Sequence, residues 1–272
     1  MGEHFGDWHL SRNGSCRVYS KEDFVGLRKA GDLAAHILDY ITPYVEAGIT
    51  TLELDTLCHN EIIKHNAIPA PLGYNGYPKS TCISLNHVVC HGIPSDRKLR
   101  NGDILNIDVT VIFDGWYGDT SRMYIVGKPS PKAMELIDVT YQSMMLAIEM
   151  VKPGIFLGDI GYAIQNFAEE RKFSVVRDYC GHGIGRVFHD DPAVLHYGKP
   201  KTGVQLVPGN VFTIEPMINV GSYKTKVLAD GWTAITSDHS LSAQFEHTIG
   251  VTEDGYEIFT LSREGKTKPP YK

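Results

Sequence analysis

The chain has 272 residues, of which 42% are hydrophobic and 21% charged, and this length and composition are typical of one large or two small globular domains with a sizeable core. A formal net charge of −6 argues against nucleic acid or an anionic membrane as the main partner. No apolar run approaches the roughly 20 residues that span a bilayer, and the acid-containing first residues predict no signal peptide.

Helices are predicted first along the chain, after an arm. Residues 1–19 show no hydrophobic periodicity, and we expect a loose arm there. Ser20 followed by Asp23 is typical of a capping box, and apolar residues at helical spacing predict a helix that ends at Gly48. A second capping box, a Thr with a Glu three residues later, predicts another helix over residues 50–62.

A strand with an acid on its polar face is predicted after a turn-rich loop over residues 69–78. Within residues 103–113, large apolar residues alternate with Asn106, Asp108 and Thr110. Apolar residues therefore cover one face of this predicted strand, and Asp108 lies on the other.

The second half of the chain repeats this order of elements. Ser130 and Pro131 open a predicted helix, and Asp159 starts another. Residues 211–216 then alternate as a strand that carries Glu215.

Matched segments in the two halves indicate an internal duplication. Each half offers His-Gly-Ile, then an acid on a strand, then a second acid. The pairs are EAGITTLELD (46–55) with KPGIFLGDIG (152–161), CHGIP (90–94) with GHGIG (181–185), LRNGDILNID (99–108) with LVPGNVFTIE (206–215), and GDTS (118–121) with FEHT (245–248). The alternative is that helix-helix-strand units resemble one another generally. Duplication predicts a single domain over residues 20–262, with halves 20–128 and 129–262, followed by a tail at 263–272.

Four acids meet in one place if the two halves face each other. They are Asp108 and Asp119 from the first half and Glu215 and Glu246 from the second. Neighbouring carboxylates cannot all stay ionised without positive charge between them, and two divalent cations roughly 3.5 Å apart would supply it. With His182 added, the donor set suits manganese, iron, cobalt or zinc. Each residue alone has an ordinary interpretation, a solvated acid or a structural histidine, so the hypothesis rests on the set.

Other catalytic motifs are missing from the sequence. There is no His-Glu-x-x-His helix, no Gly-x-Ser-x-Gly elbow and no Walker loop. A Cys90 nucleophile beside His91 is conceivable, but adjacent residues of a strand point opposite ways, which disfavours direct activation. The five cysteines, an odd count without a Cys-x-x-Cys pair, predict reduced thiols in a cytoplasmic protein.

Six spaced segments, in order along the chain, carry a resemblance to a known family. They are NHVVCHGIP (86–94), NIDV (106–109), GDTSR (118–122), CGHGIGRVFHDDP (180–192), FTIEPMI (212–218) and LSAQFEHTI (241–249). They resemble the signature segments of the type I methionine aminopeptidases, and the similarity extends from about residue 20 to about residue 262. It implies the α+β pita-bread fold, in which a curved antiparallel sheet with pseudo-twofold symmetry carries helices on its outside.

The resemblance implies hydrolysis of the first peptide bond of a substrate with an N-terminal methionine and a small second residue, at two metal ions. Asp119 and Glu246 would bridge the metals, and Glu215 would also accept the proton of the attacking water. His91 would contact the substrate near the attack site, and His189 the scissile peptide group. The implied metal ligands are Asp108, Asp119, His182, Glu215 and Glu246.

The resemblance also implies an apolar pocket for the thioether, where aromatic rings suit a polarisable sulfur. Pro71 stands where relatives often have a cysteine, which affects the shape of this pocket rather than the reaction. The implied wall includes Tyr74, Tyr77, Cys82, Phe188 and Trp232. The positions that bind a monovalent cation in some relatives are matched by Asn86, Val88 and Ser242.

Segment lengths distinguish the types within this family. The stretch from His182 to Glu215 is too short for the helical insert of type II enzymes, and residues 1–19 hold one cysteine, too few for a zinc-binding extension. The resemblance implies a monomeric bacterial cytoplasmic enzyme that acts on peptides and nascent chains, also at the ribosome. Two alternatives stay open: another pita-bread peptidase of the prolidase or X-Pro aminopeptidase kind, and a non-catalytic pita-bread binding module.

Overall fold

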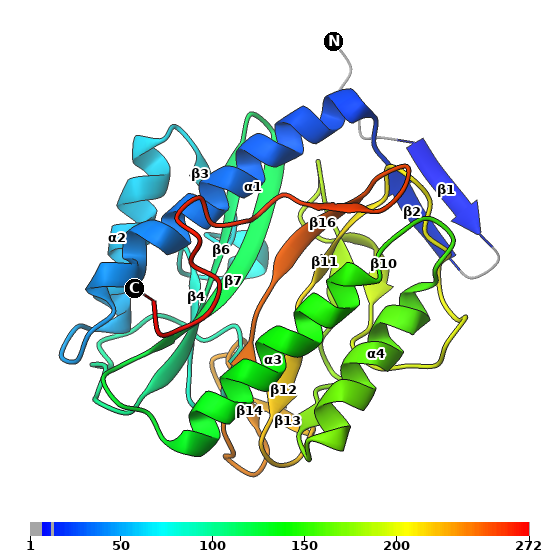
Figure 1. Ribbon diagram of the computed structural model, residues 1–272. Helices are drawn as coiled ribbons and strands as arrows, with labels where there is room; N and C mark the ends of the chain where they lie inside the picture. Colours follow the sequence, from blue (N-terminus) through cyan, green and yellow to red (C-terminus); the bar gives the residue numbers. More distant parts are fainter. Residues whose placement is uncertain (1–6, 12–13, 272) are drawn as a thin grey trace.

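Two pairs of helices cover the strands of the protein, one pair for each half of the chain (Figure 1). The structure is a computed structural model that describes residues 7–11 and 14–271. Within this part, no helix has the length and apolar character needed to cross a membrane. The helices are α1 (Lys21–Ile41) and α2 (Thr51–Lys64) in the first half, and α3 (Pro131–Glu149) and α4 (Leu157–Glu170) in the second.

Strands form the inner layer, and every strand pair described is antiparallel, so the fold is α+β. The first half contains β1 (Asp7–Ser11), β2 (Gly14–Val18), β3 (Ile68–Pro69), β4 (Cys82–Leu85), β5 (Val88–Cys90), β6 (Ile104–Phe113) and β7 (Trp116–Ile125). The second contains β8 (Ser174–Val175), β9 (Gly181–Gly183), β10 (Asp190–Val194), β11 (Val211–Ile214), β12 (Met217–Asn219), β13 (Thr225–Val227), β14 (Ala234–Thr236), β15 (Ser242–Gln244), β16 (His247–Val251) and β17 (Tyr256–Ile258). Short 3-10 turns are η1 (Thr42–Tyr44) and η2 (Tyr74–Gly76).

The two halves meet where β7 approaches the start of β16. In the first half β6 pairs with β3, β4 and β7, and the second half has the strand order β10-β9-β11-β16-β17. An isolated bridge joins Ser121 to Glu246. The hydroxyl of Thr120 donates to the carbonyl of Glu246 and that of Thr248 to the carbonyl of Asp119, both at 2.7 Å. These bonds hold the acidic segments of the two halves side by side.

The hydrophobic core lies in two main clusters, one beneath each helix pair. The cluster beneath α1 and α2 includes Leu105, Ile107, Val109 and Val111 of β6, all fully buried. The alternation predicted for residues 103–113 is therefore confirmed. Each such side chain stabilises the fold by roughly 1.5–3 kcal/mol on burial, and together they fix which face of β6 carries Asp108.

Local capping signals correctly predicted where helices begin. Ser20 accepts from the amide of Asp23, and Thr50 from that of Glu53, each at 3.1 Å, and both capping boxes are complete. Such a cap contributes about 1 kcal/mol. Asp159, the expected start of the fourth helix, is instead its third residue, and its carboxylate accepts from the N-cap amide at 2.9 Å.

Two elements end earlier than the hydrophobic periodicity of the sequence predicts, and a proline explains each difference. The first helix ends at Ile41 and not at Gly48, because Pro43 has no amide hydrogen and its ring clashes with a helical carbonyl one turn earlier. Likewise β11 ends before Glu215, since Pro216 cannot donate to a neighbouring strand.

The N-terminal segment is more ordered than its sequence predicts. The expectation of a loose arm over residues 1–19 is wrong where the structure describes it, because β1 and β2 form an antiparallel hairpin. Cys16 is fully buried in the core cluster beneath α3 and α4, and Arg17 forms an ion pair with Asp190. These partners are distant in sequence, so local periodicity could not reveal them.

Candidate active site

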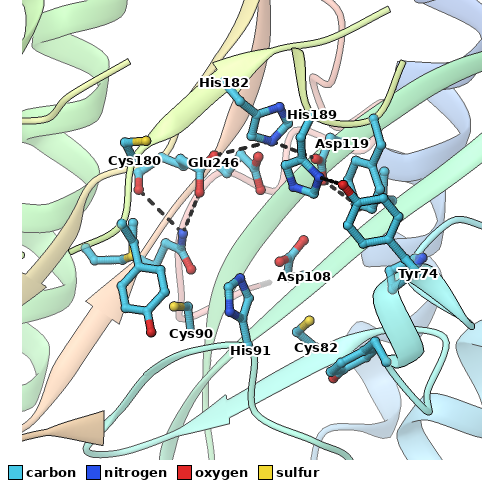
Figure 2. Close-up of a pocket in the computed structure, with 18 of the residues that line it drawn as sticks. Tyr74, Cys82, Cys90, His91, Asp108, Asp119, Cys180, His182, His189 and Glu246 are labelled. Carbon is cyan, nitrogen blue, oxygen red and sulfur yellow. Dashed lines mark hydrogen bonds and ion pairs between the residues drawn. The ribbon is translucent and has the colours of Figure 1, made fainter. Parts of the chain in front are cut away.

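A cavity of about 330 Å³ receives side chains from both halves of the chain. Figure 2 shows it with the carboxylate of Asp108 lying between His91 and His189. All the residues predicted as ligands, as catalytic groups or as the methionine pocket line this cavity, so the structure brings them together, and their roles stay predictions. They are Tyr74, Tyr77, Cys82, His91, Asp108, Asp119, His182, Phe188, His189, Glu215, Trp232 and Glu246.

The pairing of β6 with β7 places two carboxylates on one face. Asp119 lies directly opposite Thr110, two residues beyond Asp108 on the same face of β6. The hydroxyl of Thr110 donates to Asp119 at 2.7 Å. Strand alternation and register alone therefore turn both acids into the cavity.

His182 is held on β9 by two glycines. A Cβ at Gly181 would lie 2.4 Å from the carbonyl oxygen of Thr213, and one at Gly183 would lie 2.1 Å from that of Asp191. Neither position has room for a side chain, so the neighbouring strands approach β9 closely. This approach fixes where the imidazole projects.

The imidazole of His182 faces the acids with a nitrogen suited to metal binding. Its Nδ1 lies 3.0 Å from the carbonyl of Gly183, so Nδ1 carries the hydrogen. Nε2 then presents its lone pair, 3.5 Å from Asp119 Oδ2 and 3.7 Å from Glu215 Oε1. A backbone carbonyl behind a histidine is the usual arrangement at metal sites.

Glu215 and Glu246 complete the acidic cluster from the second half. Glu215 accepts from the hydroxyl of Thr213 at 2.8 Å and from the amide of Gln244 at 3.1 Å. Glu246 is only 2% exposed, and its backbone amide donates to Ser121 at 3.1 Å. The carboxylates are therefore held by strands and by neighbouring side chains.

Burial and mutual repulsion disfavour simultaneous ionisation of the acids. Burial raises the pKa of Asp108 well above the ordinary value, and the charges of Asp119 and Glu215 raise it further. Burial has the same effect on the pKa of Glu246, and it raises the pKa of Glu215 to about 7. Among the described residues, Asp108 Oδ1 is buried without a hydrogen-bond partner.

The donor set therefore fits divalent cations. Asp119, His182 and Glu246 each offer a ligand atom, all within 4.8 Å of one another. Oxygen donors with one imidazole suit manganese, iron, cobalt or zinc. Positive charge here would also relieve the repulsion that raises the pKa values of the acids.

Two further histidines face the cavity and are neutral near pH 7. Burial lowers the pKa of His189 to about 4, and the ring stacks on Phe188 with centroids 4.0 Å apart. Its Nδ1 lies 2.9 Å from the hydroxyl of Tyr74. Burial also lowers the pKa of His91, whose ring lies edge-on to Tyr179 at 5.4 Å.

Aromatic rings form the apolar wall of the cavity. Tyr77 lies edge-on to Trp232 with centroids 5.2 Å apart, and Tyr74 meets Phe188 at 4.8 Å. Pro71, noted from the sequence for its effect on pocket shape, also lines the cavity.

Some lining residues were missed by the sequence reasoning. They include Thr110, Asp178, Tyr179, Cys180, Met217 and Gln244. Strand alternation could have found two of them, because Thr110 shares a face with Asp108, and Gln244 is two residues before Glu246. The conceivable nucleophile Cys90 lines the cavity too, but burial raises the pKa of its thiol well above the ordinary value, so it is protonated near pH 7.

The residues matched to a monovalent cation site lie close together. The carbonyl of Asn86 accepts from the amide of Ser242 at 2.8 Å. Ser242 begins β15, which contacts β5, where Val88 is the first residue. The hydroxyl of Ser242 is buried without a partner among the described residues. Cation binding here stays a prediction.

Comparisons with known proteins identify relatives along nearly the whole chain. The model of metallopeptidase family M24 matches residues 25–253. The chain is 62% identical to the methionine aminopeptidase of Rickettsia prowazekii (94% of this chain, 99% of that protein) and 56% identical to that of Escherichia coli K12 (91% and 94%). The crystal structure of the R. prowazekii protein matches with a TM-score of 0.90 at 63% identity, over 90% of this chain and 100% of that one. The Pyrococcus furiosus prolidase, at 23% identity, a TM-score of 0.70 and coverage of 89% and 65%, shares the fold.

Proposed function

This chain belongs to metallopeptidase family M24, and from that premise we propose how its residues carry out the reaction. The activity is that of a methionine aminopeptidase, the removal of an N-terminal methionine. The observation that supports the mechanism best is the convergence of four carboxylates and one imidazole beside an aromatic wall in a single cavity.

We propose that the five ligand side chains hold two divalent metal ions. Asp119 and Glu246 lie on adjoining segments of the two halves and would bridge both ions, while Asp108, His182 and Glu215 would complete the two coordination shells. When bound, such ions lower the pKa of a water molecule and polarise a peptide carbonyl. The partnerless oxygen of Asp108 supports this assignment, because a buried carboxylate without a donor calls for a cation.

Glu215 is the proposed proton acceptor for the attacking water. Its Oε1 lies 3.7 Å from Nε2 of His182, so the carboxyl lies within the ligand cluster, where a base can reach a bound water. Thr213 and Gln244 hold its two oxygens in place. The same carboxyl would pass the proton to the leaving amine.

His189 is the proposed donor to the oxygen of the scissile peptide group. When the hydroxyl of Tyr74 donates to Nδ1, the hydrogen of the neutral ring must lie on Nε2. That hydrogen could stabilise negative charge as it develops on the carbonyl oxygen. His91, neutral as well, would contact the substrate on the other side of the carboxylates.

The aromatic wall is the proposed site for the methionine side chain. The rings of Tyr77 and Trp232, together with the thiol of Cys82, offer the polarisable apolar surface that a thioether prefers. A small second residue of the substrate would fit best in the remaining space. The substrates we propose include nascent chains in the cytoplasm, in part at the ribosome.

The domain organisation is proposed as read from the sequence: one catalytic unit over residues 20–262, built from two halves related by a pseudo-twofold axis. The order of helices and strands in each half supports this division. We propose a monomer, with a monovalent cation held near Asn86, Val88 and Ser242. A non-catalytic role is not favoured, since all five ligand side chains line the cavity. X-Pro cleavage is not favoured because the methionine aminopeptidases match the chain at far higher identity than the prolidase does.

Peptide hydrolysis tests this proposal. After chelation and metal add-back, the wild type should release methionine from Met-Ala-Ser far faster than leucine from Leu-Ala-Ser, with no cleavage of an X-Pro peptide. Asp108→Asn should lose nearly all activity. Asp114→Asn, an exposed acid in the turn of the same hairpin, is the matched control and should keep it. Full activity of Asp108→Asn would overturn the metal assignment.

A further inference from the structure

A second group of metal-binding side chains lies on the outer helices. His36 projects from α1, and Glu61 and His65 come from the end of α2. Ligand atoms of all three lie within 4.8 Å of one another. None of them lines the catalytic cavity, and the core between α1, α2 and β6 separates the group from Asp108.

We propose that His36, Glu61 and His65 form an auxiliary site for one divalent cation of the zinc type, which ties α1 to α2. Two imidazole nitrogens and one carboxylate oxygen are a zinc donor set, and water can fill the fourth position of a tetrahedron. The set lacks the many oxygen donors that calcium or magnesium requires.

Distances within the group match this coordination. Nε2 of His36 lies 3.4 Å from Oε1 of Glu61, and Nε2 of His65 lies 3.2 Å from the same oxygen. Two donors at zinc bond lengths of about 2.0–2.1 Å lie about 3.3 Å apart in a tetrahedron. Both histidine side chains are about two-fifths exposed, at 39% and 41%, so their rings can rotate to close on one ion.

The end of α2 holds two of the ligands in a fixed position. Glu61 and His65 are one helical turn apart and share a face. After His65, Asn66 takes a positive φ of 58°, and the amide of Ala67 returns to the carbonyl of Ile62 at 3.2 Å. This is the Schellman arrangement that closes a helix, and the negative end of the helix dipole favours a cation beside it.

The buried negative charge of Glu61 also favours a cation at this point. The Glu61 side chain is only 7% exposed, and the ammonium of Lys64 lies 3.0 Å from both of its oxygens. A divalent ion would replace that ammonium, which sits on a mostly exposed side chain and can turn to solvent. Lys64 is therefore a competitor of the metal, and its removal should strengthen binding.

Zinc binding to the full chain tests the proposal by difference. In equilibrium dialysis at micromolar zinc, the wild type should hold one more zinc ion than the double variant His36→Gln/His65→Gln. Ions in the catalytic cavity cancel in this difference, because both proteins keep that site. Loss of one histidine should weaken this site by more than about tenfold, since loss of even an outer-shell partner of a metal site costs about 10–100-fold. Lys64→Gln should bind the additional ion more tightly.

Stability and activity give independent readouts. Zinc should raise the melting temperature of the wild type more than that of the double variant, because a ligand of the native state stabilises it. With manganese as the added metal and no zinc, methionine release should be equal in the two proteins. Equal zinc content in wild type and double variant would overturn the proposal and leave an ion-pair cluster around Glu61. Weaker binding by Lys64→Gln would contradict the displacement of the ammonium.

Discussion

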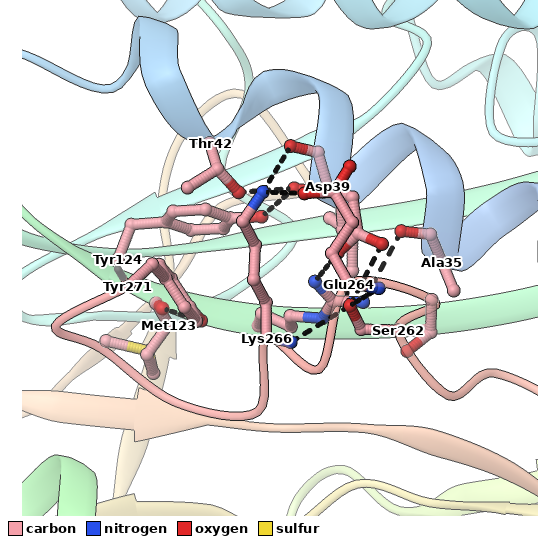
Figure 3. Close-up of polar contacts among 12 residues, drawn as sticks. Ala35, Asp39, Thr42, Met123, Tyr124, Ser262, Glu264, Lys266 and Tyr271 are labelled. Carbon is pink, nitrogen blue, oxygen red and sulfur yellow. Dashed lines mark hydrogen bonds and ion pairs between the residues drawn. The ribbon is translucent and has the colours of Figure 1, made fainter.

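The buried ion pair between Arg122 and Asp39 offers a quantitative test of what joins α1 to the sheet. Arg122 on β7 donates to Asp39 at 2.5 Å, and the two side chains are 2% and 3% exposed. Arg122 also reaches the carbonyl of Ala35 at 3.3 Å. Figure 3 shows that Asp39 accepts in addition from Ser262 of the C-terminal segment, at 2.8 and 2.9 Å.

Replacing Arg122 with methionine should therefore cost far more than the loss of a surface ion pair. Asp39 would stay buried without its cation, and breaking a buried pair in this way costs about 3–5 kcal/mol of unfolding free energy. Arg263→Met is the matched control. Its partner Asp32 lies on α1, as Asp39 does. The side chains of Arg263 and Asp32 are 69% and 41% exposed, and exposed ion pairs contribute about 0–1 kcal/mol.

Urea denaturation of the two variants measures both free energies. We expect a large fall for Arg122→Met and almost none for Arg263→Met. The double variant Arg122→Met/Asp39→Leu should recover much of the loss, because no unpaired charge remains. Equal small losses in both single variants would refute the reasoning, as would a double variant less stable than Arg122→Met.

Three further predictions concern the active site. Tyr74→Phe should lower kcat about fivefold with little change in KM, because the loss of about 1 kcal/mol of hydrogen bonding frees the His189 ring to change tautomer. Steady-state kinetics with Met-Ala-Ser would show it, and an unchanged kcat would contradict it. Trp232→Ala should reduce kcat/KM for methionine peptides about 10–200-fold, the range for apolar pocket contacts, and an unaltered preference for Met over Leu would argue against the pocket. In the metal-free protein, Glu215 should contribute less stability as pH rises from about 4.5 through 7, because burial raises its pKa from 4.5 to about 7 and the folded state binds the proton more tightly than the unfolded state does. Buried histidines with lowered pKa values contribute in the opposite direction, so the readout is the difference between chelated wild type and Glu215→Gln. The melting temperature of the wild type should fall relative to that of Glu215→Gln across this range, and a constant difference would contradict the raised pKa.

Much of the fold could be predicted because its signals are local. Capping boxes gave the starts of α1 and α2, and alternation gave β6 with its buried and acidic faces. Segment ends were less accurate where periodicity continued past a proline, as at Pro43 and Pro216. The hairpin of β1 and β2 was missed although it is local and the sequence Asn13-Gly14 is a typical hairpin signal. Only its packing against β10 and β11 depends on strands that are distant in sequence.

The candidate site could be predicted as a set of residue types but not as a geometry. Alternation and the matched halves indicated the four acids and His182. The resemblance indicated His91, His189 and the pocket residues. The contact between Tyr74 and His189 joins a loop to a distant segment, and no spacing rule reveals it. The group around Glu61 escaped notice for the same reason, since only the packing of α1 on α2 creates it.

Anomalous diffraction from crystals soaked in manganese tests the central claim most directly. We expect two peaks in the cavity, both within coordinating distance of Asp119 and Glu246, with Asp108, His182 and Glu215 around them. Peaks elsewhere, or a cavity without manganese at saturating concentration, would contradict the proposed dinuclear centre.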